Sequence, residues 1–151
     1  MLTRLKDAHA ELRTAIAELE TETRRHEPDE ATLSNARLKL TRTSSRRKAL
    51  IDQEIFPALR DLSPEQQRRV DELRRTASDV ALLSSRHIGD WTMRAILADW
   101  PGYRRASQAM RSAMMQRIAE ESAILYPLLG GPADGPPARA DFTVRYASIP
   151  I

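Results

Sequence analysis

A helix ending that occurs twice constrains the fold of this chain more than any other feature of its sequence. Phe56-Pro57-Ala58-Leu59 is matched 70 residues later by Tyr126-Pro127-Leu128-Leu129, and an arginine, Arg47 or Arg117, stands ten residues before each proline. Proline removes a backbone donor and is common where a helix stops. The repeat therefore predicts two similar pairs of helices, with the first helix equivalent to the third and the second equivalent to the fourth.

The composition supports a helical, cysteine-free domain. Aromatic residues make up 5% of the chain and glycine occurs five times, whereas Ala, Leu, Arg and Glu are abundant. This balance favours helix over sheet, and 151 residues suit one domain with a modest core. The lack of cysteine excludes disulfides, thiolate metal sites and thiol catalysis. No apolar segment has the length of a membrane span, so we expect a cytoplasmic protein without a membrane partner.

Apolar residues recur at helical spacing in four long segments. The pattern predicts helices over about residues 1–26, 29–56, 63–88 and 101–129, with a short helical segment over 90–97. The short links between them predict an all-α, up-down-up-down four-helix bundle over residues 1–129. Three ionisable residues interrupt the apolar stripes: His9 in the first helix, Arg47 in the second and Arg117 in the fourth.

The C-terminal residues 130–151 have a different character. Residues 130–138 are rich in glycine and proline and are predicted to form a linker. An extended tail follows, in which Phe142, Val144 and Tyr146 alternate with other residues as in a strand. Three interpretations stay open: the tail packs on its own helices, it docks as a strand onto a partner protein, or it has no fixed structure.

Four segments of the first 129 residues resemble the hemerythrin-like (HHE cation-binding) family. They are Leu5-Lys-Asp-Ala-His9-Ala-Glu-Leu12, Ile55-Phe-Pro-Ala-Leu59, Asp99-Trp-Pro-Gly-Tyr103 and Leu125-Tyr-Pro-Leu-Leu129. The resemblance implies a four-helix bundle whose core holds a pair of iron ions, often with oxygen, through histidines and carboxylates. It also implies a His-x-x-x-Glu motif ahead of the aromatic-proline ending in the second and fourth helices.

Most of the metal ligands implied by that resemblance are missing. The two motifs are Arg47-Lys-Ala-Leu-Ile51 and Arg117-Ile-Ala-Glu-Glu121, so only His9 and Glu121 match the family's ligands. Asp79 is a third candidate, because the 70-residue offset makes it the equivalent of His9. Arginine stays protonated and cannot donate a lone pair to a metal. This donor set is too small for two irons, and we expect no cofactor.

The two arginines suggest a replacement for the metals. We hypothesise that Arg47 and Arg117 supply the missing positive charge, pair with Glu121 and Asp79, and form with His9 a polar network in the core. In the alternative, both side chains extend outward from the edge of the apolar stripe and end in solvent.

The leading functional hypothesis is a non-enzymatic interaction or regulatory protein with an unidentified protein partner. The sequence contains no nucleophile–base pair, phosphate-binding glycine loop or zinc-ligand spacing. The alternative is a residual metal-binding or gas- and redox-sensing protein that holds iron or another divalent metal at low occupancy, with ligands from His9, Glu121, Asp79 and His87. Acidic residues accompany the arginine pairs and the net charge is only +3, which disfavours nucleic-acid binding. A homo-oligomer is compatible with the sequence.

Overall fold

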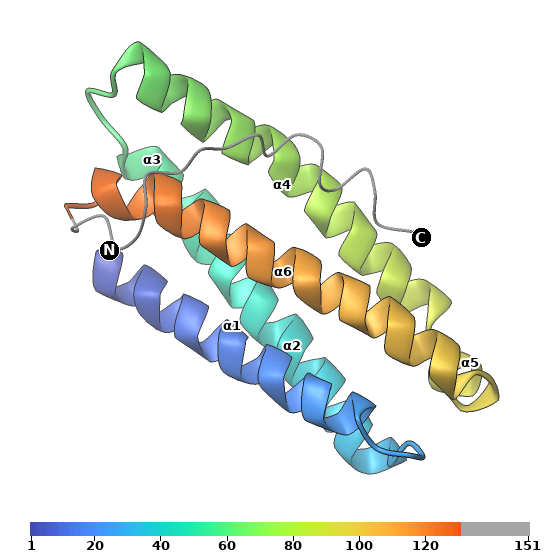
Figure 1. Ribbon diagram of the computed structural model, residues 1–151. Coiled ribbons are helices and arrows are strands. Elements are labelled where there is room, and N and C mark those ends of the chain that lie inside the picture. Colours follow the sequence, from blue (N-terminus) through green and yellow to red (C-terminus); the bar gives the residue numbers. More distant parts are fainter. Residues whose placement is uncertain (131–151) are drawn as a thin grey trace.

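The computed structural model describes residues 1–130, and every regular element among them is helical (Figure 1). The predicted all-α class is confirmed for these residues. The elements are α1 (Leu2–Thr23), α2 (Glu30–Leu50), the π-helix η1 (Ile51–Ile55), α3 (Phe56–Ala58), α4 (Pro64–Asp90), α5 (Met93–Ala98) and α6 (Trp100–Leu128). The linker and the tail, including Phe142, Val144 and Tyr146, lie outside the described residues.

Side-chain caps fix where the helices begin. Ser63 and Gln66 form a capping box at the start of α4, in which each side chain accepts a hydrogen bond from the backbone N–H of the other. Asp29 caps α2 in one direction only, because its carboxylate accepts from the N–H of Thr32. At the start of α6, Asp99 accepts from the N–H of Gly102, and a Cβ added to this glycine would lie 2.1 Å from Asp99 Oδ2. Glycine at position 102 therefore leaves room for the Asp99 carboxylate to reach the backbone N–H.

The second predicted helix contains a π-helical turn that the sequence pattern did not indicate. Helix α2 passes without a break into η1 and then α3, and Ile51 and Ile55 of η1 are both buried. A π turn changes the direction in which the following side chains point, and such turns are frequent at functional sites.

The third helix ends slightly later than predicted. Helix α4 continues past His87 to Asp90, and the N–H of Trp91 bonds to the His87 carbonyl.

The long helices lie alongside one another (Figure 1). Their buried faces form two apolar clusters. Helix α1 packs along α2 and against α6, while α6 also packs against α4 and α5. One cluster includes Leu5, Ile55, Val70 and Leu125, and the other includes Leu12, Leu33, Ile96, Tyr103 and Ile118. Because His9 lies between Leu5 and Leu12 on α1, the boundary between the clusters is where buried polar groups occur.

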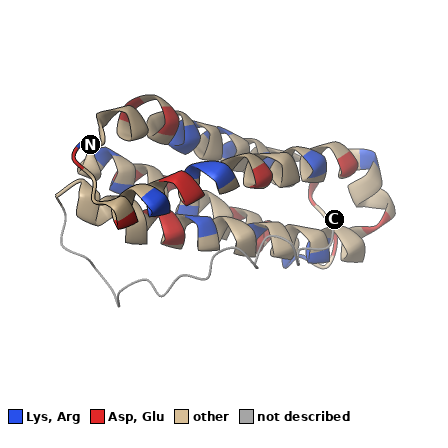
Figure 2. Ribbon diagram, turned by 90° about the horizontal axis from the view of Figure 1, so that it is seen from above, with Lys and Arg blue, Asp and Glu red and all other residues tan. Residues whose placement is uncertain are grey.

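The surface carries both signs of charge along every long helix (Figure 2). Surface ion pairs such as Arg4–Glu54 and Lys39–Glu18, each 2.7 Å long, join different helices. Exposed pairs of this kind contribute little stability. None of the helices within residues 1–130 is both long and apolar enough to cross a membrane.

Candidate functional site

Four ionisable side chains from three helices are buried between the two apolar clusters. Arg47 of α2 and Arg117 of α6 are only 8% and 4% exposed, and His9 and Glu121 are fully buried. Guanidinium and carboxylate groups are almost never found this deep unless they are paired. The alternative in which both arginines end in solvent is therefore wrong. We call these four residues the polar core network.

Glu121 is the centre of the polar core network. Arg47 Nη1 donates to both carboxylate oxygens, and its distance to Oε2 is 2.7 Å. His9 Nε2 lies 3.5 Å from Glu121 Oε1, and Arg117 Nε lies 4.0 Å from Oε2. Burial alone would raise the pKa of the Glu121 carboxyl, but the contact with His9 and the charges of Arg47 and Arg117 outweigh it, so the pKa lies below its ordinary value. Glu121 is therefore a carboxylate at neutral pH.

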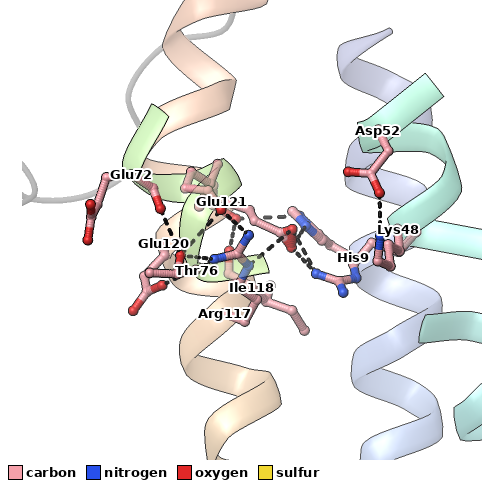
Figure 3. Close-up of polar contacts among 12 residues, drawn as sticks. His9, Lys48, Asp52, Glu72, Thr76, Arg117, Ile118, Glu120 and Glu121 are labelled. Carbon is pink, nitrogen blue, oxygen red and sulfur yellow. Dashed lines mark hydrogen bonds and ion pairs between the residues drawn. The ribbon is translucent and has the colours of Figure 1, made fainter. Parts of the chain in front are cut away.

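Arg117 ties α6 to α4 through neutral groups. Its Nη1 donates to Thr76 Oγ1 at 2.8 Å and its Nη2 donates to the Leu73 carbonyl at 2.7 Å (Figure 3). The Thr76 hydroxyl lies 3.0 Å from the Glu72 carbonyl, which orients it as an acceptor for the guanidinium. Glu120 Oε2 lies 3.9 Å from Arg117 Nη1. Both Nη nitrogens of Arg117 thus have a partner, which fixes the position of the guanidinium group.

His9 links the network to the end of α6. Its Nδ1 lies 2.7 Å from the Tyr126 hydroxyl and 3.5 Å from Ser122 Oγ. Ser122 donates its own proton to the Ile118 carbonyl at 2.7 Å. Since His9 Nε2 faces the Glu121 carboxylate, the proton of a neutral ring is favoured at Nε2, and Tyr126 then donates to Nδ1. The second aromatic-proline ending therefore supplies a hydrogen-bond partner for His9.

The structure does not bring Asp79 into this network. Asp79 is exposed on α4, and its charge acts on Arg75 rather than on Arg117. The buried face of α4 is formed by Leu73, Thr76 and Val80, and Thr76 takes the place predicted for Asp79. The predicted pairing of Arg117 with Asp79 is wrong, because the 70-residue offset relates the two helix endings but not the inward faces of α1 and α4.

His87 lies far from His9. Its half-buried ring stacks on Tyr103 with centroids 6.0 Å apart, and burial together with the charge of Arg37 lowers its pKa. Tyr103 precedes Tyr126, the partner of His9, by 23 residues on α6. A helix rises by about 1.5 Å per residue, so these two positions are roughly 35 Å apart. The predicted metal site that joins His9 to His87 is therefore wrong.

The remaining donors do not fit a metal ion. Residues 1–130 contain no group of three or more His, Cys, Asp or Glu side chains placed to hold one. Both oxygens of Glu121 accept hydrogen bonds from Arg47, and His9 Nδ1 is engaged by Tyr126. Among the histidine and carboxylate atoms of the network, only His9 Nε2 lacks a hydrogen-bond partner in the described chain, and the favoured tautomer places a proton on it. One imidazole nitrogen beside two guanidinium groups is a poor donor set for a divalent cation.

Sequence reasoning missed several buried polar residues. Glu120 and Arg111 are 2% and 9% exposed, and Thr76 is 5% exposed. Arg111 has neutral partners, with Nε 3.3 Å from Ser107 Oγ and Nη2 3.3 Å from Thr23 Oγ1. Thr76 was detectable, because it lies on the same apolar stripe as Val70, Leu73 and Val80. Glu120 and Arg111 lie beside the stripe of α6, where charged residues are usually solvated.

Helices α2 and α4 face each other across a cleft of about 620 Å³, which we call the α2–α4 cleft. Its floor is α6, and Arg47, Arg117 and Glu121 line it together with apolar and small residues. The polar core network is therefore partly accessible from one side. No sequence pattern indicated this opening.

Comparisons with known proteins add no relative to these observations. No protein-family model, curated protein or solved structure matches the chain.

Proposed function

We propose that this chain is a hemerythrin-like helical bundle that has lost di-iron binding and acts without catalysis, by binding another molecule in an interaction or regulatory role. The observation that carries the proposal is the buried Glu121 carboxylate, which is held by Arg47 with Arg117 and His9 beside it. Glu121 and His9 are the two residues that match the metal ligands of the family. Guanidinium groups take the place of the metal cations.

An up-down-up-down topology is part of the proposal. Its support is that α1, α2, α4 and α6 are long, follow one another through short connections, and pack as α1 with α2, α1 with α6, and α4 with α6. Short links favour antiparallel neighbours. The open α2–α4 cleft is the point at which the arrangement departs from a closed bundle. A cytoplasmic location, unconnected with membranes, completes the proposal.

Electrostatics supports the loss of metal. A divalent cation at Glu121 would have to displace Arg47 from both carboxylate oxygens and would then lie close to two guanidinium groups. Burying like charges together is strongly unfavourable in an environment of low polarity. The arginines satisfy the carboxylate without a metal.

The same network is poorly suited to proton transfer. The lowered pKa of Glu121 keeps it ionised at neutral pH, and an effective general acid or base has a pKa near the working pH. Arginine does not lose its proton under these conditions. The chemistry of the network is therefore to hold charge in a fixed position, which suits recognition.

One observation favours the residual metal-binding alternative. His9 Nε2 lacks a hydrogen-bond partner within the described residues and faces Glu121 Oε1 at 3.5 Å, so the tautomer with its proton on Nδ1 would offer two donors to a metal. Two protein donors beside two arginines would hold a metal weakly.

Metal titration separates the two functions. Untagged protein is titrated by calorimetry with Mn²⁺, Zn²⁺ and, without oxygen, Fe²⁺, and we expect no saturable binding tighter than about 100 µM. The double substitution Arg47→His and Arg117→His restores two family ligands and is expected to bind at least about tenfold tighter. Arg104→His, on the exposed face of α6, is the matched control and should change nothing. Binding of one metal by the native protein, abolished by His9→Ala, would establish the alternative instead.

A further inference from the structure

Small side chains on both walls create the room in the α2–α4 cleft. Helix α2 contributes Thr41, Ser44 and Ser45, and α4 contributes Ala77, Ala81 and Ser84. Ser84 faces the floor, because its Oγ lies 3.7 Å from Met110 Sδ on α6. The volume of about 620 Å³ is within the range of sites for small molecules.

The cleft is long and its middle is apolar. Its floor runs along α6 from Tyr103 to Glu121, and 18 residues of helix span roughly 27 Å. Met110 and Met114 form the middle of this floor, and methionine adapts readily to flexible apolar partners. An elongated apolar molecule fits this shape better than a compact polar one.

Positive charge exceeds negative charge along the cleft. Five cationic side chains line it against two carboxylates; the cations are Arg37, Arg47, Lys48, Arg111 and Arg117, and the carboxylates are Asp52 and Glu121. Lys48 pairs with Asp52, and Arg47 pairs with Glu121. Arg117 lies 3.9 Å from the carboxylate of Glu120, which does not line the cleft, so the excess positive charge belongs to Arg37 and Arg111. Charge complementarity therefore favours an anionic ligand.

One end of the cleft has a buried donor without an acceptor in the described part of the chain. Arg47 is 8% exposed, and its buried Nε has no hydrogen-bond acceptor within residues 1–130. Arg111, in contrast, already donates to Ser107 and Thr23, and Arg37 donates to the Trp91 carbonyl at 2.6 Å. A carboxylate at Arg47 would satisfy this buried donor.

We propose that the α2–α4 cleft binds a long-chain fatty acid, with its carboxylate at Arg47 near Arg117 and its hydrocarbon chain over Met110 and Met114. The inference deepens the proposed function by naming a ligand class, and it rests on Glu121 being held by Arg47 rather than by a metal ion. A guanidinium recognises a carboxylate strongly, whereas it gains less from a neutral alcohol and repels an ammonium group. The ligand is thus selected by chain length and by charge together.

Binding of three probes with equal chain length tests the charge requirement. Full-length, delipidated protein is titrated with palmitate, hexadecanol and hexadecyltrimethylammonium, each below its micellar concentration, by displacement of a fluorescent fatty acid. Palmitate is expected to bind at one per chain in the micromolar range, and the ammonium compound at least about tenfold more weakly. Absence of saturable palmitate binding, or equal binding of the ammonium compound, would overturn the proposal. Neither outcome changes the metal titration, so the two proposals fail separately.

Matched substitutions locate the binding site. Ser84→Phe fills the cleft, whereas Ser78→Phe places the same ring on the exposed face of α4. We expect the first to weaken palmitate binding at least about tenfold and the second less than about twofold, with unchanged helical circular dichroism. Equal effects would place the ligand elsewhere and refute the assignment.

The double substitution Arg47→Met and Glu121→Gln tests the position of the carboxylate, because it removes both members of a buried ion pair together. Palmitate binding should fall at least about tenfold while hexadecanol binding stays within about twofold. A parallel loss of both ligands would overturn the placement of the head group.

Alanine substitutions at Phe142, Val144 and Tyr146 test whether the chain's own tail occupies the cleft. Palmitate binding that requires these substitutions would assign the cleft to the tail and refute the proposal.

Discussion

Replacing Arg47 with methionine is the sharpest stability test of the polar core network. Methionine preserves much of the apolar stem of arginine but removes the cation that donates to both oxygens of Glu121. The carboxylate is then left fully buried, with His9 at 3.5 Å and Arg117 at 4.0 Å as its remaining partners. The substitution should therefore strand a negative charge in the core.

The expected cost follows from the burial of the pair. Removing one partner of a buried ion pair costs about 3–5 kcal/mol, and the two remaining partners place this case near the lower end, at about 3 kcal/mol. Adding Glu121→Gln removes the stranded charge, so the double variant should recover a large part of this loss. We expect a coupling energy of about 2 kcal/mol between positions 47 and 121.

Urea unfolding followed by circular dichroism measures the free energy of unfolding of the native protein, both single variants and the double variant. Lys48→Met is the matched control, because Lys48 is the adjacent residue and its pair with Asp52 is largely solvent-exposed. It should cost less than about 0.5 kcal/mol, since solvent screens such pairs. A loss below about 1 kcal/mol for Arg47→Met, or strictly additive effects in the double variant, would refute the burial argument.

Three further predictions concern the same helices. Arg117→Leu should lower the free energy of unfolding by about 3 kcal/mol, because it leaves buried acceptors on α4 and α6 unpaired. The exposed control Arg104→Leu should change it by less than about 0.5 kcal/mol in the same unfolding assay. The folded-state pKa of Glu121 lies below its ordinary 4.5, so protons bind the unfolded chain more tightly and stability should fall as the pH drops below 4.5. Acid titration of Glu121→Gln should show a smaller loss, and identical profiles would contradict the pKa shift. Gly102→Ala should cost about 1 kcal/mol by displacing the Asp99 cap, and its effect should not add to that of Asp99→Ala in thermal unfolding.

Much of the fold follows from local patterns in the sequence. Apolar spacing places the long helices, and Asp29 and Ser63 stand at predicted helix starts that the structure retains as side-chain caps. The π turn over Ile51–Ile55 was not predictable, because the apolar pattern continues through it and the turn depends on how η1 packs. The extra residue that a π turn adds to a helix is determined by tertiary contacts, which the local apolar pattern does not encode.

The candidate site was predictable only in part. Arg47 and Arg117 stand at stripe positions, which favoured burial, and Glu121 lies one turn after Arg117 on the same face. The assignment of Asp79 failed because a constant offset does not preserve which face of a helix is buried. Thr76 replaced it, since a hydroxyl can accept from a guanidinium without bringing a second charge into the core. The α2–α4 cleft depends on the separation of two helices, which side-chain periodicity does not encode.

Metal content tests the central claim most directly. Untagged protein is expressed with iron, manganese and zinc supplied, purified without chelators, and measured by elemental analysis against protein concentration. If Arg47 and Arg117 occupy the place of the metals, the protein should contain less than about a tenth of a metal ion per chain. About one metal per chain, lost in His9→Ala, would contradict the account and establish His9 and Glu121 as ligands.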